Sequence, residues 1–151
     1  MTDFFASLFE WWGLNPLYAT DLGEHLRGYN LQGTYDGTPW YSNIGWILFG
    51  STLLIFALQY FIINSSRFNR AWHWWVMALI LASINFGTAF TIPYNDLNSG
   101  NINTHLHVTI SDCIGFGVSS AIWSIILLGA VTITPLKKLS SQCRNTTFWK
   151  P

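Results

Sequence analysis

Long apolar runs without charge, separated by short polar segments, dominate the pattern of this chain. The runs cover residues 44–63, 74–92 and 113–134, and none of them contains Asp, Glu, Lys, Arg or His. Because an α-helix rises about 1.5 Å per residue, a helix over each run would cross the roughly 30 Å hydrocarbon core of a bilayer. The pattern therefore predicts an all-α integral membrane protein with three transmembrane helices.

Residues 3–12 have a different pattern, with the 3.6-residue period of an amphipathic helix. Its apolar arc is formed by Phe4, Phe5, Leu8, Phe9 and Trp12. An arc with this many aromatic side chains is unfavourable in water. We therefore consider two locations for the helix. The helix could lie flat on the outer leaflet of the membrane, or it could dock onto a partner or a second copy of the chain.

Each predicted span has one side of polar or small residues and one side of large apolar residues. The polar positions are Thr52, Gln59, Asn85, Ser120 and Ser124. The small positions are Gly45, Ala78, Ala82, Ala89, Gly117 and Ala121. Small residues let transmembrane helices approach closely, and polar residues form hydrogen bonds between them. The polar residues could equally line a water-filled path, but only in a ring of several chains, because three packed helices fill their own interior.

Composition supports a membrane protein with a single domain over residues 1–151. Half of the residues are hydrophobic, 17% are aromatic and only 9% are charged, whereas a soluble domain has about 25% charged residues. We expect an outer N-terminal segment over 1–41, a three-helix bundle over 42–134 and a basic tail over 135–151. Phe148 and Trp149 in this tail suggest an anchor at the membrane surface.

The net charge is zero, but the charges are unevenly distributed. All basic residues except Arg27 lie between the first two spans or after the third: Arg67, Arg70, Lys137, Lys138, Arg144 and Lys150. Basic residues in short loops remain in the cytoplasm. We therefore expect the N-terminus outside and the C-terminus in the cytoplasm, in a membrane of the bacterial inner-membrane type.

Candidate catalytic chemistry is sparse. The predicted outer segments contain His105, His107, Asp96 and Asp112, with Glu24 and His25 from the N-terminal part. His105 and His107 form a His-x-His pair, which is a weak metal candidate without a third fixed ligand. We therefore expect no metal, no cofactor, no enzymatic activity and no nucleic-acid partner.

Two classes of function fit these features. The first is a homo-oligomeric pore or ion channel, favoured by the polar and small sides of the spans. The second is a non-catalytic subunit, anchor or immunity or accessory protein of a larger membrane complex. The expected partners are the lipid bilayer and either further copies of the chain or other membrane subunits.

Overall fold

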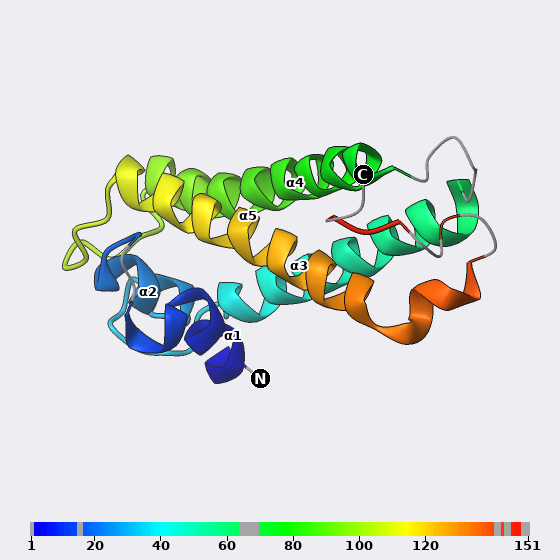
Figure 1. Ribbon diagram of the computed structural model, residues 1–151. Helices are drawn as coiled ribbons and strands as arrows, with labels where there is room; N and C mark the ends of the chain where they lie inside the picture. The colour runs from blue at the N-terminus through cyan, green and yellow to red at the C-terminus, as the bar shows by residue number, and fades with distance from the viewer. Residues whose placement is uncertain (1, 15–16, 64–69, 141–142, 144–145, 149–151) are drawn as a thin grey trace.

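The computed structural model describes residues 2–14, 17–63, 70–140, 143 and 146–148, with the side chains of Lys137 and Leu139 left out. All regular elements in this part of the chain are helical, which confirms the predicted all-α class (Figure 1). They are α1 (Thr2–Phe9), η1 (Trp11–Gly13), α2 (Thr20–Leu26), α3 (Trp40–Ala57), η2 (Leu58–Ile63), α4 (Ala71–Asn98), α5 (Ile110–Ile133) and η4 (Pro135–Leu139).

Three long rods lie side by side and form the body of the molecule (Figure 1). They are α3 continued by the π-helical η2, then α4, then α5, and each is long and apolar enough to cross a membrane. Helix α4 packs more extensively on α5 than on α3. The chain is thus an integral membrane protein with three membrane-spanning helices, as the apolar runs predicted.

The helices extend beyond the predicted spans at the ends where polar residues begin. Helix α4 continues through Pro93 to Asn98, although the apolar run of the predicted span ends at residue 92. Hydropathy identifies the part of a helix that is apolar enough to lie in lipid. The helix itself continues as far as its backbone hydrogen bonds do. Residues 95–98, which include the polar Asn95, Asp96 and Asn98, therefore extend the helix past its apolar section.

The N-terminal segment folds against the spans of its own chain. Helix α1 packs on α3 and α5, and Phe5, Leu8 and Phe9 are buried in the same core as Tyr41 and Phe116. The predicted arc therefore contacts neither lipid nor a partner at these three positions. Only Phe4 and Trp12 of the arc are exposed.

Two close approaches fix this docking. A Cβ atom added to Gly45 would lie 2.1 Å from the Phe5 ring, and one added to Gly115 would lie 1.7 Å from the carbonyl oxygen of Leu17. Both distances are far shorter than any real Cβ contact, so only glycine allows these surfaces to meet. Between the two contacts the chain reverses through Trp11 and Trp12, which have φ angles of 51° and 55°.

The core has two parts along the long axis. One part joins α1 and α2 to the first turns of α3 and to α5. The other joins η2, the start of α4 and the end of α5, and it includes Cys143 of the tail. Phe148 packs on Trp74, with 5.2 Å between the ring centroids. It therefore contacts the protein instead of serving purely as a membrane anchor, while Trp149 lies outside the described residues.

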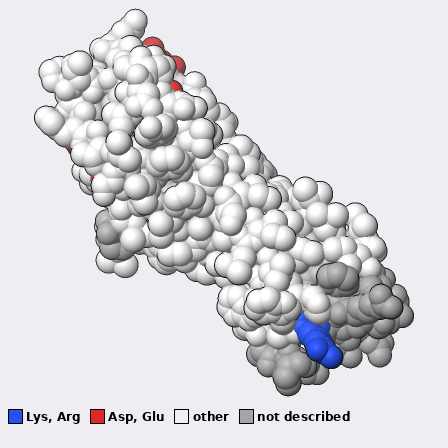
Figure 2. Space-filling model, turned by 90° about the horizontal axis from the view of Figure 1, so that it is seen from above, with Lys and Arg blue, Asp and Glu red and all other residues white. Residues whose placement is uncertain are grey.

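Charge is separated along the same axis. Figure 2 shows acidic side chains at one end of the molecule and basic ones at the other. We call the end that carries Asp21, Glu24 and Asp96 the acidic end, and the end that carries Arg70 and Lys138 the basic end. Arg67, Arg144 and Lys150 lie outside the described residues.

We predict that Gly115→Ala destabilises the protein, because the new methyl group would collide with a backbone carbonyl that cannot rotate away. Overpacking of this kind costs about 1–3 kcal/mol, so the melting temperature in detergent should fall. Gly50→Ala is the matched control, since nothing lies within 4 Å of the Cβ position there. Equal melting temperatures for the two variants would contradict the close approach of Leu17.

Candidate functional site

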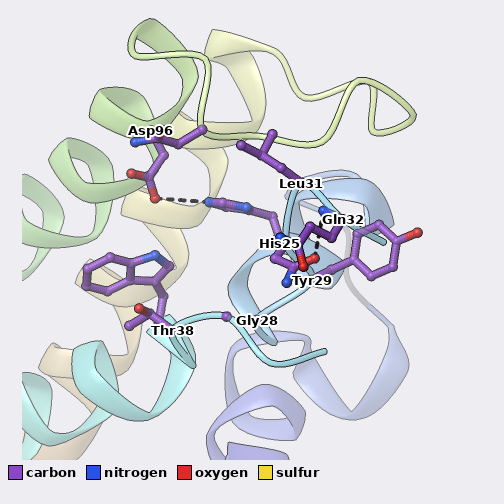
Figure 3. Close-up of a pocket in the computed structure, with 11 residues that line it drawn as sticks. His25, Gly28, Tyr29, Leu31, Gln32, Thr38 and Asp96 are labelled. Carbon is purple, nitrogen blue, oxygen red and sulfur yellow. Dashed lines mark hydrogen bonds and ion pairs between the residues drawn. The ribbon is translucent and has the colours of Figure 1, made fainter. Parts of the chain in front are cut away.

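A polar cleft at the acidic end is the most site-like feature of the described residues. Its volume is about 450 Å³, within the range of roughly 300–1,000 Å³ that is usual for small-molecule sites. The cleft lies between α2, the loop that follows it and the end of α4 (Figure 3). The residues that line it are His25, Gly28, Tyr29, Asn30, Leu31, Gln32, Gly37, Thr38, Trp40, Asp96 and Asn101.

His25 and Asp96 form the centre of this cleft. The Nε2 atom of His25 lies 3.0 Å from Oδ2 of Asp96, and the two side chains point toward each other across the gap between α2 and α4 (Figure 3). The side chain of His25 is 7% exposed and that of Asp96 is 17% exposed. A hydrogen bond between a buried imidazole and a carboxylate joins residues that are 71 positions apart in the chain.

Each residue of this pair has a second polar side-chain atom that forms no hydrogen bond with the described residues. Nδ1 of His25 is buried and has no hydrogen-bond partner among the described residues. The second oxygen of Asp96, Oδ1, also accepts no hydrogen bond from the described residues, and it is not buried. Asp96 can therefore accept a hydrogen bond from a ligand while it still holds His25.

The wall formed by the loop after α2 is internally braced. Gly28 has a φ angle of +102°, and Gly37 donates its backbone N–H to the carbonyl oxygen of Gly28 at 2.9 Å. A Cβ atom on either glycine would lie within 2.9 Å of the other's carbonyl oxygen. Inside the loop, the side-chain oxygen of Asn30 accepts the backbone N–H groups of Gln32 and Thr34. The wall is thus formed before any ligand arrives.

Carboxylates join the two segments of the cap, which we define as residues 17–39 and 99–109, and attach the cap to a span. Asp112 of α5 accepts the backbone N–H of Ala19 at 2.9 Å, and Asp21 accepts that of His107, in the other segment of the cap, at 2.9 Å. Within the cap, the side-chain amide of Asn103 donates to the carbonyl oxygen of Asn30 at 2.9 Å. These bonds place the cleft in a fixed position relative to the bundle.

The positive charge of Arg27, which belongs to the cap, is compensated by Glu10. Arg27 donates from Nη2 to Oε2 of Glu10 at 2.7 Å and from Nε to Oε1 at 3.3 Å. These hydrogen bonds raise the pKa of the Arg27 guanidinium. Glu10 also accepts the hydroxyl of Tyr41, which lies 2.9 Å from that of Tyr18. Burial raises the pKa of the Tyr18 hydroxyl, which therefore stays protonated at neutral pH.

The polar residues predicted within the spans all point into the bundle of a single chain. Thr52, Gln59, Asn85, Ser120 and Ser124 are buried. Thr52 and Ser124 donate to carbonyl oxygens of their own helices. The Gln59 amide and the Ser120 hydroxyl have no hydrogen-bond partner among the described residues.

Asn85 binds a residue that the sequence did not suggest. Its amide nitrogen donates to Oγ of Ser51 at 3.0 Å and to the carbonyl oxygen of Leu81 at 3.0 Å. The periodicity identified the side of α4 that carries Asn85, but spacing along one helix does not show which residue of another helix it faces. The sequence signal for Ser51 is only that it is a second polar residue, next to Thr52.

The small residues of the spans lie at or near contacts between elements. Gly45 faces Phe5 of α1, and a Cβ atom on Gly117 would lie 3.0 Å from the Phe86 ring of α4. Ala78, Ala82 and Ala89 are buried, and Ala121 is half-buried. Gly45 thus packs a span, α3, against the N-terminal helix α1 and not against another span.

His105 and His107 belong to no metal site in the described part of the chain. His105 and His107 are exposed, and Nδ1 of His107 lies 3.9 Å from Asp21. In the described part of the chain, no group of three His, Cys, Asp or Glu side chains is arranged to hold a metal ion. Of the polar set that the sequence singled out, the structure brings His25 and Asp96 together.

Comparison with protein-family models, with curated proteins and with solved structures finds no match to this chain.

We predict that Asp96→Ala lowers the stability of the protein by about 1–3 kcal/mol, because it leaves Nε2 of the buried His25 without a partner. The measurement is the melting temperature in detergent. Asp3→Ala is the control: it removes an exposed carboxylate, and its effect should stay within about 0.5 kcal/mol. If both variants melt at the wild-type temperature, the His25–Asp96 bond does not hold the cap to α4.

Proposed function

We propose that this chain is a non-catalytic membrane subunit that binds a small organic amine in the cleft at its acidic end. The observation that carries the proposal is the cleft itself, in which an accessible oxygen of Asp96 lies beside a buried His25. The three spans anchor the subunit, and the cap presents the cleft at the membrane surface.

The chemistry of the lining favours a cationic ligand that donates hydrogen bonds. No Lys or Arg is among the residues that line the cleft. Asp96 offers a carboxylate oxygen, and Trp40 and Tyr29 offer aromatic faces of the kind that attract an ammonium group. An anionic ligand would meet no compensating charge there, because Arg27 is held by Glu10.

The homo-oligomeric pore remains a prediction with weaker support. Its candidate lining residues are buried between the helices of one chain, whereas a ring of chains needs them on the outer surface of the bundle. The surface of the spans carries large apolar side chains instead, among them Leu53, Leu54 and Leu79. Such a surface suits lipid or the apolar face of another membrane protein.

The binding test uses the full chain purified in mild detergent. We expect primary amines to raise its melting temperature in a titratable way, and neutral or anionic analogues of similar size to have no effect. In Asp96→Asn, the dissociation constant should rise by about 10- to 100-fold, since a hydrogen bond to a charged group contributes about 1.5–3 kcal/mol. Asn keeps an acceptor oxygen for His25, so the fold should persist.

Asp3→Asn is the matched control for this titration and should bind as the wild type does. Equal amine affinity in Asp96→Asn and the wild type would exclude Asp96 from the site. If no amine binds the wild-type protein, the proposed ligand class is wrong. Ionic conductance of the purified chain in planar bilayers would favour the pore instead.

We further propose that the acidic end lies outside the cell and the basic end in the cytoplasm, because Arg70 directly precedes α4 and Lys138 lies in η4, both at the end opposite α2 (Figure 1). His105→Cys and Lys138→Cys test this orientation. Both natural cysteines are buried, so a membrane-impermeant maleimide added to intact cells should label only His105→Cys. Labelling of Lys138→Cys alone would reverse the orientation.

A further inference from the structure

An apolar groove lies between α4 and α5 at the basic end of the bundle. Its volume is about 390 Å³, and its walls include Trp74 and Trp75 of α4, Ile126 and Ile133 of α5, and Phe148 of the tail. The groove is separate from the cleft, because it lies at the first turn of α4, whereas Asp96 lies in the last. The lining is almost entirely carbon.

The groove exists because its floor has no side chain. Gly129 lies on α5 between the walls, and the atom nearest to a Cβ added there is Cε1 of Phe148 at 3.9 Å. A small side chain would fit without strain, whereas a leucine would fill the space. The Cβ position of Gly129 is therefore open, with Phe148 at ordinary contact distance, whereas neighbouring atoms occupy the Cβ positions of Gly45 and Gly115.

One wall of the groove is held rigidly. Trp74 is buried, and its indole Nε1 donates to Oγ1 of Thr132 at 3.0 Å. Its ring packs on Phe148 with 5.2 Å between centroids and on Trp75 in an edge-on arrangement with 5.0 Å between centroids. Trp75 is 44% exposed, so its ring also forms part of the outer rim.

The surroundings of the groove identify its occupant. In a membrane-spanning bundle, an apolar groove on the outer surface of the helices faces acyl chains and not water. The exposed basic residues Arg70 and Lys138 flank the same end, one directly before α4 and the other in η4 after α5. Basic residues at a membrane surface attract anionic headgroups.

We propose that this groove binds one acyl chain of an anionic phospholipid, whose phosphate lies at the level of Arg70 and Lys138. The chain lies along Gly129 between Trp75 and Phe148. A second copy of the protein fits less well, because a stable protein interface needs about 800 Å² from each partner, and a groove of this volume accepts a single chain-like group. The proposal is independent of the ligand of the cleft.

The test compares phosphatidylglycerol with phosphatidylcholine of the same acyl chains, added to the full chain in detergent. Native mass spectrometry counts the bound lipid, and the melting temperature reports its effect. We expect one phosphatidylglycerol to be retained and to raise the melting temperature more than phosphatidylcholine does. In Gly129→Leu the affinity should fall about tenfold, as expected when about two methylene groups lose their contacts.

Gly50→Leu is the control for Gly129→Leu, because its Cβ position is open and exposed on α3, and it should bind lipid like the wild type. Replacing Arg70 and Lys138 by Gln should abolish the preference for phosphatidylglycerol but leave binding of both lipids. Equal lipid binding in the two leucine variants would overturn the proposal. So would a change in oligomeric state in Gly129→Leu without any change in bound lipid, which would make the groove an interface between copies.

Discussion

Close approach at glycine is the constraint on which this fold depends. Apolar helices in lipid gain little by burying side chains, because the lipid tails are equally apolar, so they associate through van der Waals contact and hydrogen bonds. Among the glycines of the spans, Gly45, Gly115 and Gly117 have the closest neighbours. Two of these three contacts attach the N-terminal segment and not another span. The bundle is therefore completed by residues that lie outside the spans in sequence.

Hydrogen bonds between buried polar groups are the second constraint, although Gln59 and Ser120 have no such partner among the described residues. Asn85 bonds to Ser51, Thr52 bonds to its own helix, and Trp74 bonds to Thr132. At the acidic end, carboxylates bond to backbone N–H groups of neighbouring segments. Hydrogen bonds between transmembrane helices contribute about 0.6 kcal/mol on average, so their main effect here is to fix which surfaces meet.

The features that depend on local pattern could be predicted from the sequence. Uncharged runs predicted the three spans, which the structure has as α3 with η2, α4 and α5. Features that depend on distant residues could not. Periodicity identified the apolar arc of residues 3–12 but not the surface that Phe5 and Phe9 would meet. His25 and Asp96 were recognised as polar candidates, yet nothing in their spacing indicated that α2 would fold over the end of α4.

Helix α4 connects the features described at the two ends of the molecule. It is one continuous helix from Ala71 to Asn98, so Asp96 and Trp74 belong to the same rod, about 33 Å apart at 1.5 Å per residue. A tilt of this rod displaces both residues together. Ligands bound in the proposed cleft and groove would therefore contact the same helix. If one ligand changed the affinity for the other, the second would change the affinity for the first by the same factor.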